Sequence, residues 1–176
     1  MPSANANITV FVSYSRKDSH IIQPLVKLLR LSDDRVFRDE DNLEPGARWR
    51  IEIESAIDHC TVFLLFWCSH SAGSKEVLSE FRRALNCGKR IVPVLLDDTT
   101  MSEEVGQFQG IDLRGFGPHA QGQRTGFADG ITMTEEEYRV ALRKMEEHLQ
   151  HRMASFISHW LREEFEPKQS RLDHHG

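Results

Sequence analysis

The sequence predicts an α/β domain built around an open parallel sheet with helices on both faces. Short apolar runs of strand length alternate with amphipathic segments of helix length along most of the chain. The run at 61–67 (TVFLLFW) is apolar on consecutive residues, as expected of a central parallel strand that is covered on both sides. Strands and helices that alternate at this spacing favour parallel strands joined by right-handed crossovers.

Five strands are expected, each from a short run rich in β-branched, aromatic or aliphatic residues. Their predicted ranges are 8–13, 35–37, 61–67, 90–96 and 111–113. Five strands fit the flavodoxin-like order 2-1-3-4-5, in which a ligand lies where the strand order reverses. Pro93, inside the fourth run, is unusual there because it has no amide hydrogen to donate to the sheet.

Helices are predicted where apolar residues recur every three or four positions. Asp18 is the expected N-cap of the first helix, and Pro24 leaves the start of that helix open. Ser74 is the expected N-cap of the third helix, with Glu76 in its first turn. The predicted helices cover about 21–29, 49–57 and the segment between Ser74 and Gly88, and the loops between them include 38–46 and 68–73.

The last part of the chain is predicted to be a helical extension that begins with a Thr134–Glu137 capping box. Roughly 30 helical residues span about 45 Å, which is longer than the domain needs. We expect the apolar stripe of this segment to cover the open face of the sheet, with packing against another subunit or a bend into two helices as alternatives. The predicted division is 1–7, a disordered N-terminus; 8–115, the domain core; 116–133, a glycine-rich loop; 134–166, a C-terminal helix or helix pair; and 167–176, a polar tail.

Composition narrows the class of protein. The chain has 176 residues, of which 39% are hydrophobic, and a net charge of -5, without the clustered basic excess of a nucleic-acid binder. The longest apolar run, 62–68, is too short to cross a membrane, and no signal peptide is apparent. The three cysteines lack metal-ligand spacing, so reduced thiols in a cytoplasmic protein without a metal site are expected.

Candidate site residues follow from the rule that an open parallel sheet binds ligands beyond the carboxyl ends of its strands. Arg16 and the amides beside it suit a phosphate group. The sequence contains no Gly-x-Gly-x-x-Gly or Walker motif, which excludes an ordinary dinucleotide or P-loop site. The side chains expected at this edge are Ser13, Tyr14, Ser15 and Arg16 after the first strand, Arg38 and Asp39 after the second, and 67–74 after the third, leading into the helix with Glu80.

Glu80 lies on the shoulder of the apolar stripe of its helix. It is about 100° from the centre of that stripe at 3.6 residues per turn. Spacing alone therefore favours a solvated glutamate at this position, and Glu76 is expected to point still further outward.

Several short stretches, taken together in their order and spacing, indicate a protein family more specifically than any single residue does. The segment 11–15 (FVSYS) is an aromatic strand followed by Ser-Tyr-Ser. It is followed by Phe37-Arg38-Asp39 with Leu43, Pro45 and Gly46, and then by 49–57 (WRIEIESAI), 74–80 (SKEVLSE), 91–95 (IVPVL) and 110–114 (GIDLR). In this order and spacing the chain resembles the Toll/interleukin-1 receptor (TIR) domain family over about residues 8–115.

The resemblance implies an activity. Many TIR domains cleave NAD between ribose and nicotinamide, and their key glutamate corresponds here to Glu80. The family's Trp and Cys before that glutamate are replaced by Glu76 and Val77, and Trp67 or Trp49 is a candidate to supply an aromatic wall instead. NAD is then the substrate and no cofactor is expected. The predicted substrate-binding residues are Ser13, Tyr14, Ser15, Arg16, Arg38, Asp39, Leu43, Trp49, Trp67 and Ser74.

The expected function is an NAD nucleosidase or cyclase of bacterial type in immune signalling. Its products are nicotinamide and either ADP-ribose or a cyclic messenger that a downstream effector senses. In related enzymes the loop corresponding to 38–46 belongs to a neighbouring subunit, which implies self-association. Two alternatives stay open, a non-catalytic TIR scaffold and another enzyme on a similar fold, such as a nucleoside deoxyribosyltransferase.

Overall fold

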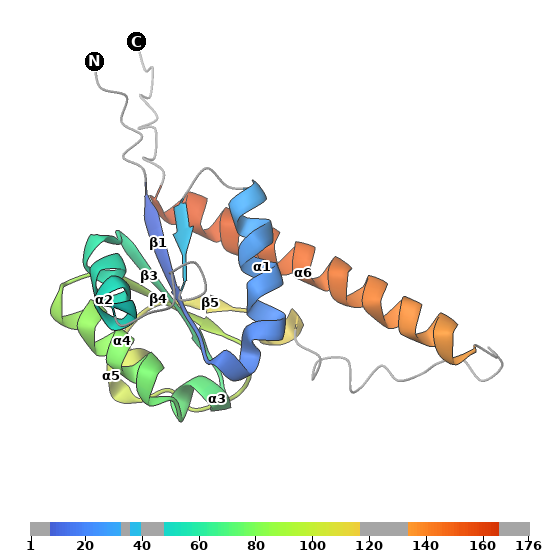
Figure 1. Cartoon of the computed structure of the whole chain (residues 1–176), viewed down its shortest axis with the longest axis horizontal. Helices are drawn as coiled ribbons and strands as arrows, with labels where there is room; N and C mark the ends of the chain where they lie inside the picture. The colour runs from blue at the N-terminus through green and yellow to red at the C-terminus, as the bar shows by residue number, and fades with distance from the viewer. Residues whose placement is uncertain (1–7, 33–35, 40–47, 117–133, 166–176) are drawn as a thin grey trace, which may run out of the picture.

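The computed structural model describes residues 8–32, 36–39, 48–116 and 134–165. Within this part of the chain, five parallel strands form one sheet in the order β2-β1-β3-β4-β5 (Figure 1). This confirms the predicted order and fold class. The strands are β1 (Thr9–Ser13), β2 (Val36–Arg38), β3 (Val62–Trp67), β4 (Arg90–Leu95) and β5 (Ile111–Asp112).

The strand bounds differ slightly from those expected. The sequence predicts that the second strand ends at Phe37, but β2 includes Arg38, which pairs with Phe11 of β1. Arg38 is an exposed residue of an edge strand, so hydrophobicity could not indicate its place in the sheet. At the other edge Gly110 passes so close to Pro93 of β4 that a Cβ there would collide with the Pro93 carbonyl oxygen. Glycine lets the chain enter β5 at this point.

Helices flank the sheet on both faces. The predicted loop at 68–73 contains a short helix, which the sequence did not indicate. Pro24 lies inside the first helix, so of the two starts left open this helix has the one before the proline. Asp18, the predicted N-cap, lies in the 3-10 turn before this helix, and its carboxylate pairs with Cys68 and His70 instead. The helical elements are η1 (Arg16–Asp18), α1 (Ser19–Ser32), α2 (Trp49–His59), α3 (Ser69–Ala72), α4 (Lys75–Asn86), α5 (Glu103–Gly106), η3 (Arg114–Phe116) and α6 (Glu135–Phe165).

The core has two layers of buried side chains, one on each face of the sheet, beneath the helices that lie on both sides (Figure 1). Because side chains alternate along a strand, Val10 and Val12 pack with α1 and α6, whereas Phe11 packs with α2 and α4. The Phe11 and Phe63 rings stack with centroids 5.8 Å apart on the α2–α4 side. Every residue of β3 is buried, as predicted for the central strand.

The two ends of α4 fix the position of Glu80 along this helix. Ser74 is the N-cap of this helix, as predicted, and its hydroxyl accepts a 3.3 Å hydrogen bond from the Val77 amide. Gly88 follows the helix with φ 67°, a left-handed conformation that favours glycine. Glu80 therefore lies in the second turn of a helix that is fixed at both ends.

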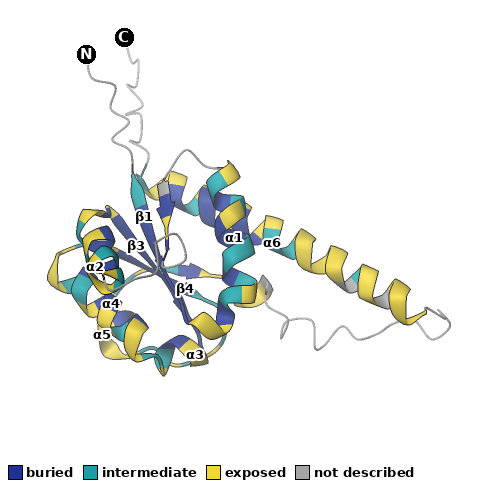
Figure 2. Ribbon diagram, viewed as in Figure 1, coloured by how far each residue is buried: buried dark blue, intermediate teal, exposed yellow. Residues whose placement is uncertain are grey.

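α6 is a single helix of 31 residues, so these residues do not form the pair of helices considered as an alternative. Its capping box is formed as predicted, with Thr134 and Glu137 exchanging two hydrogen bonds. The second half packs its buried side chains beside α1 on the same face of the sheet. Residues 143–148 are exposed, and the first half projects beyond the sheet (Figure 2). The buried side chains of α6 are Met153, Ala154, Ile157, Ser158 and Leu161.

Some expectations fall outside the described residues. They concern segments 1–7, 117–133 and 167–176 and the loop 40–47, which includes Leu43. The division of the chain into segments and the packing of α6 against another subunit therefore stay predictions. Among the described helices, none is both long and apolar enough to cross a membrane.

Candidate functional site

Glu80 and Ser13 meet at the carboxyl ends of the central strands. Ser13, the last residue of β1, pairs with Leu65 of β3 and donates a 2.6 Å hydrogen bond from Oγ to Glu80 Oε2. Glu80 is 8% exposed, so the solvated position favoured by spacing is wrong. Helix periodicity indicates only which side of α4 a residue faces. It cannot indicate that Ser13 of the strand β1 contacts Glu80. A buried carboxylate needs such a donor because desolvation otherwise makes its burial unfavourable.

Tyr14 and Asp39 form a second pair. The Tyr14 hydroxyl donates to Asp39 Oδ2 at 3.1 Å, and Arg30 Nη2 of α1 donates to Oδ1 at 3.3 Å. Arg30 also donates from Nε to the Phe37 carbonyl at 3.0 Å. Asp39 is only 2% exposed, so these contacts join the end of β2 to β1 and α1 just before segment 40–47. Sequence reasoning missed Arg30, whose helical position gives no sign of this contact.

Ser15, Arg16 and Trp49 form a third group. The Ser15 hydroxyl accepts a 3.4 Å hydrogen bond from the Lys17 amide and caps η1. The Arg16 guanidinium lies 5.0 Å from the centroid of the Trp49 ring, a cation–π contact with the first residue of α2. Arg16 is exposed and Trp49 is half-buried, so a positive charge lies beside an aromatic surface at this edge of the sheet.

Two predicted site residues, Trp67 and Ser74, make contacts that stabilise the fold. Trp67 is 3% exposed and donates from Nε1 to the Thr99 carbonyl at 3.3 Å, so its ring is part of the core on the α2–α4 side. The Ser74 hydroxyl caps α4 and donates to Glu76 Oε2 at 3.3 Å. These contacts give both residues structural roles, and binding of substrate by them stays a prediction.

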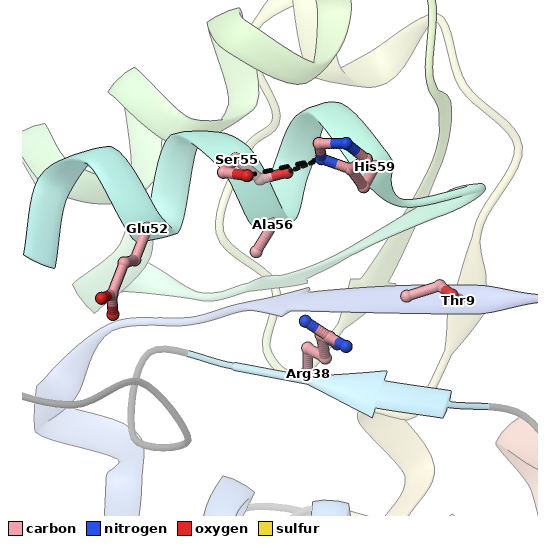
Figure 3. A pocket seen from close by; sticks show the side chains of 6 residues that line it. All are labelled: Thr9, Arg38, Glu52, Ser55, Ala56 and His59. Carbon is pink, nitrogen blue, oxygen red and sulfur yellow. Dashed lines mark hydrogen bonds between the residues drawn. The ribbon is translucent and has the colours of Figure 1, made fainter.

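Arg38 lines an open hollow of about 500 Å³ between α2 and the strands β1 and β2 (Figure 3). On α2, His59 Nδ1 pairs with the Ser55 carbonyl oxygen at 2.7 Å. Neither Ser13 nor Glu80 lines this hollow, so it is distinct from the carboxylate site. Its lining residues are Thr9, Arg38, Glu52, Ser55, Ala56 and His59.

Asp18, Cys68 and His70 form a cluster that the sequence did not indicate. Cys68 Sγ donates to Asp18 Oδ2 at 2.9 Å, and His70 Nδ1 lies 2.8 Å from Asp18 Oδ1. Asp18 and Cys68 are 7% and 5% exposed. Burial, together with the hydrogen bond to Asp18, raises the pKa of the Cys68 thiol. Asp18 lies 50 positions before Cys68. The three residues therefore match no metal-binding motif that could be recognised from spacing in the sequence.

The predicted residues thus form small groups around the end of β1. Since 13–16 are consecutive, their three partners Glu80, Asp39 and Trp49 are gathered around one short segment that follows β1. Glu80 lies on the α2–α4 side, and Asp39 lies toward α1. The arrangement presents a carboxylate, hydroxyls and a guanidinium, which suits a ligand with ribose hydroxyls and phosphates.

Comparison with known proteins supports a specific family. A family model described as TIR domain matches residues 10–125. No curated protein matches the chain. The TIR domain of the Toll-related receptor TRR-2 from Hydra magnipapillata matches with a TM-score of 0.54 and 14% identity, covering 77% of this chain and 96% of that one. This identity shows similarity of fold alone.

Two further structures match less well. The TIR domains of the activated Roq1 resistosome, which recognises the pathogen effector XopQ, have a TM-score of 0.48 and 16% identity over 84% of each chain. The CMP N-glycosidase BcmB of Clostridium botulinum has a TM-score of 0.44 and 16% identity, covering 77% of this chain and 98% of that one. Neither likeness is close enough to support an argument. The family model, in contrast, matches well over half of the chain, and the chain belongs to the TIR domain family.

Proposed function

We propose that this TIR domain cleaves NAD at the bond between ribose and nicotinamide, with Glu80 as the catalytic residue. The observation that supports the proposal is the buried Glu80 carboxylate, held by Ser13 at 2.6 Å where the central parallel strands end. This is the edge at which open α/β sheets bind nucleotides. The glutamate also has the place in the sequence that the family's catalytic glutamate occupies.

The chemistry requires little from the protein except charge and position. Nicotinamide is a good leaving group because its ring nitrogen is positively charged in NAD, so no strong general acid is needed. Its departure leaves an oxocarbenium-like ribose, which the negative charge of Glu80 stabilises. Water then adds to the ribose carbon and releases a proton, which gives ADP-ribose. Attack by an atom of the substrate's own adenosine part gives a cyclic product instead.

Arg16 and Asp39 have supporting roles in the proposal. The exposed Arg16 guanidinium, held over Trp49, binds the diphosphate, and the ring beneath it offers a surface for stacking. Asp39 joins the end of β2 to β1 and α1 through Tyr14 and Arg30, and a neighbouring copy of the domain completes the site through the loop 38–46. Activity then depends on self-association. We place the protein in the cytoplasm, in a bacterial type of immune signalling in which a downstream effector senses the product.

The test is product analysis of NAD incubated with the chain at high concentration, with and without a crowding agent. Wild type should release nicotinamide, and Glu80→Gln should release at least about a hundredfold less, since removal of one charge-stabilising group costs roughly that factor. Glu76→Gln is the matched control because Glu76 is an exposed glutamate on the same helix. It should retain wild-type activity. Equal activity in Glu80→Gln would reject Glu80 as the catalytic residue.

A non-catalytic scaffold is the second candidate. It is favoured by the residues that replace the family's Trp and Cys, since Glu76 is exposed and Val77 is a core residue at 2% exposure. Neither side chain offers an aromatic wall for nicotinamide. If the assembled wild type leaves NAD intact, and Glu80→Gln assembles equally well in light scattering, the scaffold becomes the better description.

A further inference from the structure

Three side chains that bind metals in proteins converge beside the loops after β1 and β3. They are Asp18, Cys68 and His70, and their ligand atoms all lie within 4.8 Å of one another. Both oxygens of the Asp18 carboxylate are engaged, Oδ2 by Cys68 Sγ at 2.9 Å and Oδ1 by His70 Nδ1 at 2.8 Å. A thiol, an imidazole and a carboxylate therefore point at one small volume.

The fold holds these groups in place from two directions. Cys68 directly follows β3 and caps α3, and His70 lies in the first turn of the same short helix. The Ser71 hydroxyl fixes the Cys68 backbone, because it accepts from the Cys68 amide at 2.8 Å and donates to the Cys68 carbonyl at 3.1 Å. Asp18 lies in η1, which follows β1, whereas Cys68 and His70 follow β3. The strand order reverses between these two strands. A cation here would join two segments that are otherwise separate in the chain.

The ligand set selects the metal. Thiolate and imidazole suit zinc and similar ions, whereas magnesium and calcium prefer oxygen ligands. The charges also balance, since one thiolate and one carboxylate neutralise one divalent cation in a site where Asp18 and Cys68 are nearly buried. His70 is about half exposed at 47%, which leaves a path for the ion and room for water as a fourth ligand.

We propose that Asp18, Cys68 and His70 bind one zinc ion, with water in the fourth position. In tetrahedral zinc sites with bonds of about 2.0–2.3 Å, ligand atoms lie roughly 3.4–3.6 Å apart. The two contacts of Asp18, 2.9 Å to Cys68 and 2.8 Å to His70, are made by different carboxylate oxygens. The ligand atoms of the three residues lie within 4.8 Å of one another, so zinc binding requires the side chains to adjust until one Asp18 oxygen faces both partners. On binding, the Cys68 thiol loses its proton to solvent and its sulfur forms a bond to zinc, while His70 binds through Nδ1 as the neutral ring.

The test uses the full chain, reduced and freed of metal with a chelator, and titrated with Co²⁺ as a spectroscopic probe. One Co²⁺ per chain should produce a thiolate-to-metal charge-transfer band in the near ultraviolet and the visible bands of a tetrahedral site. One equivalent of Zn²⁺ should displace it and raise the midpoint of thermal unfolding, because an ion that binds only the folded chain stabilises it. This readout is independent of NAD cleavage.

Two variants and one control decide the result. Cys68→Ser should lose the charge-transfer band, and His70→Ala, which changes a half-exposed side chain, should bind Co²⁺ at least tenfold more weakly. Cys87→Ser is the control, since Cys87 is an exposed thiol that lies 3.5 Å from Asp58. It should bind like wild type. A missing band, or a band that survives in Cys68→Ser and disappears in Cys87→Ser, would overturn the proposal.

Discussion

The Ser13 hydroxyl and the Glu80 carboxylate are joined by a 2.6 Å hydrogen bond between the end of β1 and the middle of α4. The two residues are 67 positions apart in the sequence and both are buried. The bond satisfies a carboxylate that has little contact with water, and it fixes the direction in which that carboxylate faces. The stability of the domain and its proposed chemistry therefore depend on the same pair.

Ser13→Ala should destabilise the domain, because it removes a donor from a buried carboxylate. A hydrogen bond to a charged group is worth about 2 kcal/mol in the free energy of unfolding. Urea denaturation followed by circular dichroism measures the change. Ser79→Ala, at an exposed position of α4, should change the free energy of unfolding by no more than about 0.5 kcal/mol. An equal effect of both substitutions would contradict a specific role for the Ser13–Glu80 bond.

Arg16→Ala should weaken use of NAD if Arg16 binds the diphosphate. We expect kcat/KM to fall by about tenfold or more, the equivalent of one lost charge-assisted contact, mainly through KM. Steady-state kinetics of nicotinamide release measure both constants. Arg82→Ala removes an exposed arginine from α4 as a control for net charge and should leave KM unchanged. An unchanged KM in Arg16→Ala would assign diphosphate binding to another group.

Leu161→Ala should test whether α6 is part of the core. Leu161 is fully buried against the α1 face of the sheet, and truncation of such a leucine costs about 2–5 kcal/mol. Met145→Ala, at a position 48% exposed in the projecting half of the same helix, should cost about 0.5 kcal/mol or less. Chemical denaturation compares the two. Similar losses would show that the whole helix, and not only its second half, is buried.

The stability of the domain should also depend on Asp112 at low pH. A bidentate hydrogen bond and ion pair with Arg114 lower the pKa of Asp112 to about 2. Since the folded pKa lies below the unfolded value, this pair stabilises the fold above about pH 4 and ceases to do so as the pH falls toward 2. The effect is small because both side chains are about half exposed.

Arg114→Gln should therefore lower the thermal midpoint slightly at pH 6, and the difference from wild type should shrink as the pH falls below 4. Melting curves at several pH values measure it. A difference that grew with acidity would have the wrong sign for this pair.

The three cysteines should differ in reactivity toward an alkylating reagent. Cys87 is exposed, whereas Cys60 and Cys68 are buried. Burial raises the pKa of Cys60 to about 11, so at pH 8 only about one molecule in a thousand carries the reactive thiolate. Mass spectrometry should find one rapidly labelled thiol in the native chain and three in denaturant. Rapid native labelling of Cys60 would contradict its burial in the core on the α2–α4 side.

Much of the fold could be predicted from local patterns. The apolar run of β3, the N-cap at Ser74 and the Thr134–Glu137 capping box are short-range features, and each was found where the sequence indicated. The alternation of strands and helices then restricts the topology to a parallel sheet, and this gave the correct strand order. The identity of Glu80 as the candidate catalytic residue came from the family resemblance and not from helix spacing.

The contacts of the candidate site depend on tertiary structure. Helix periodicity favoured a solvated Glu80, but Glu80 is buried and accepts a hydrogen bond from Ser13 of the strand β1. Arg30 reaches Asp39 from α1, and Asp18 meets Cys68 and His70 across the loops that follow β1 and β3. Sequence alone determined the five strands, their order and the longer helices, because those depend on local periodicity and chain connectivity, whereas the short helix α3 was not predicted. Which polar side chains meet depends on packing between elements far apart in the chain, and only the folded arrangement decided it.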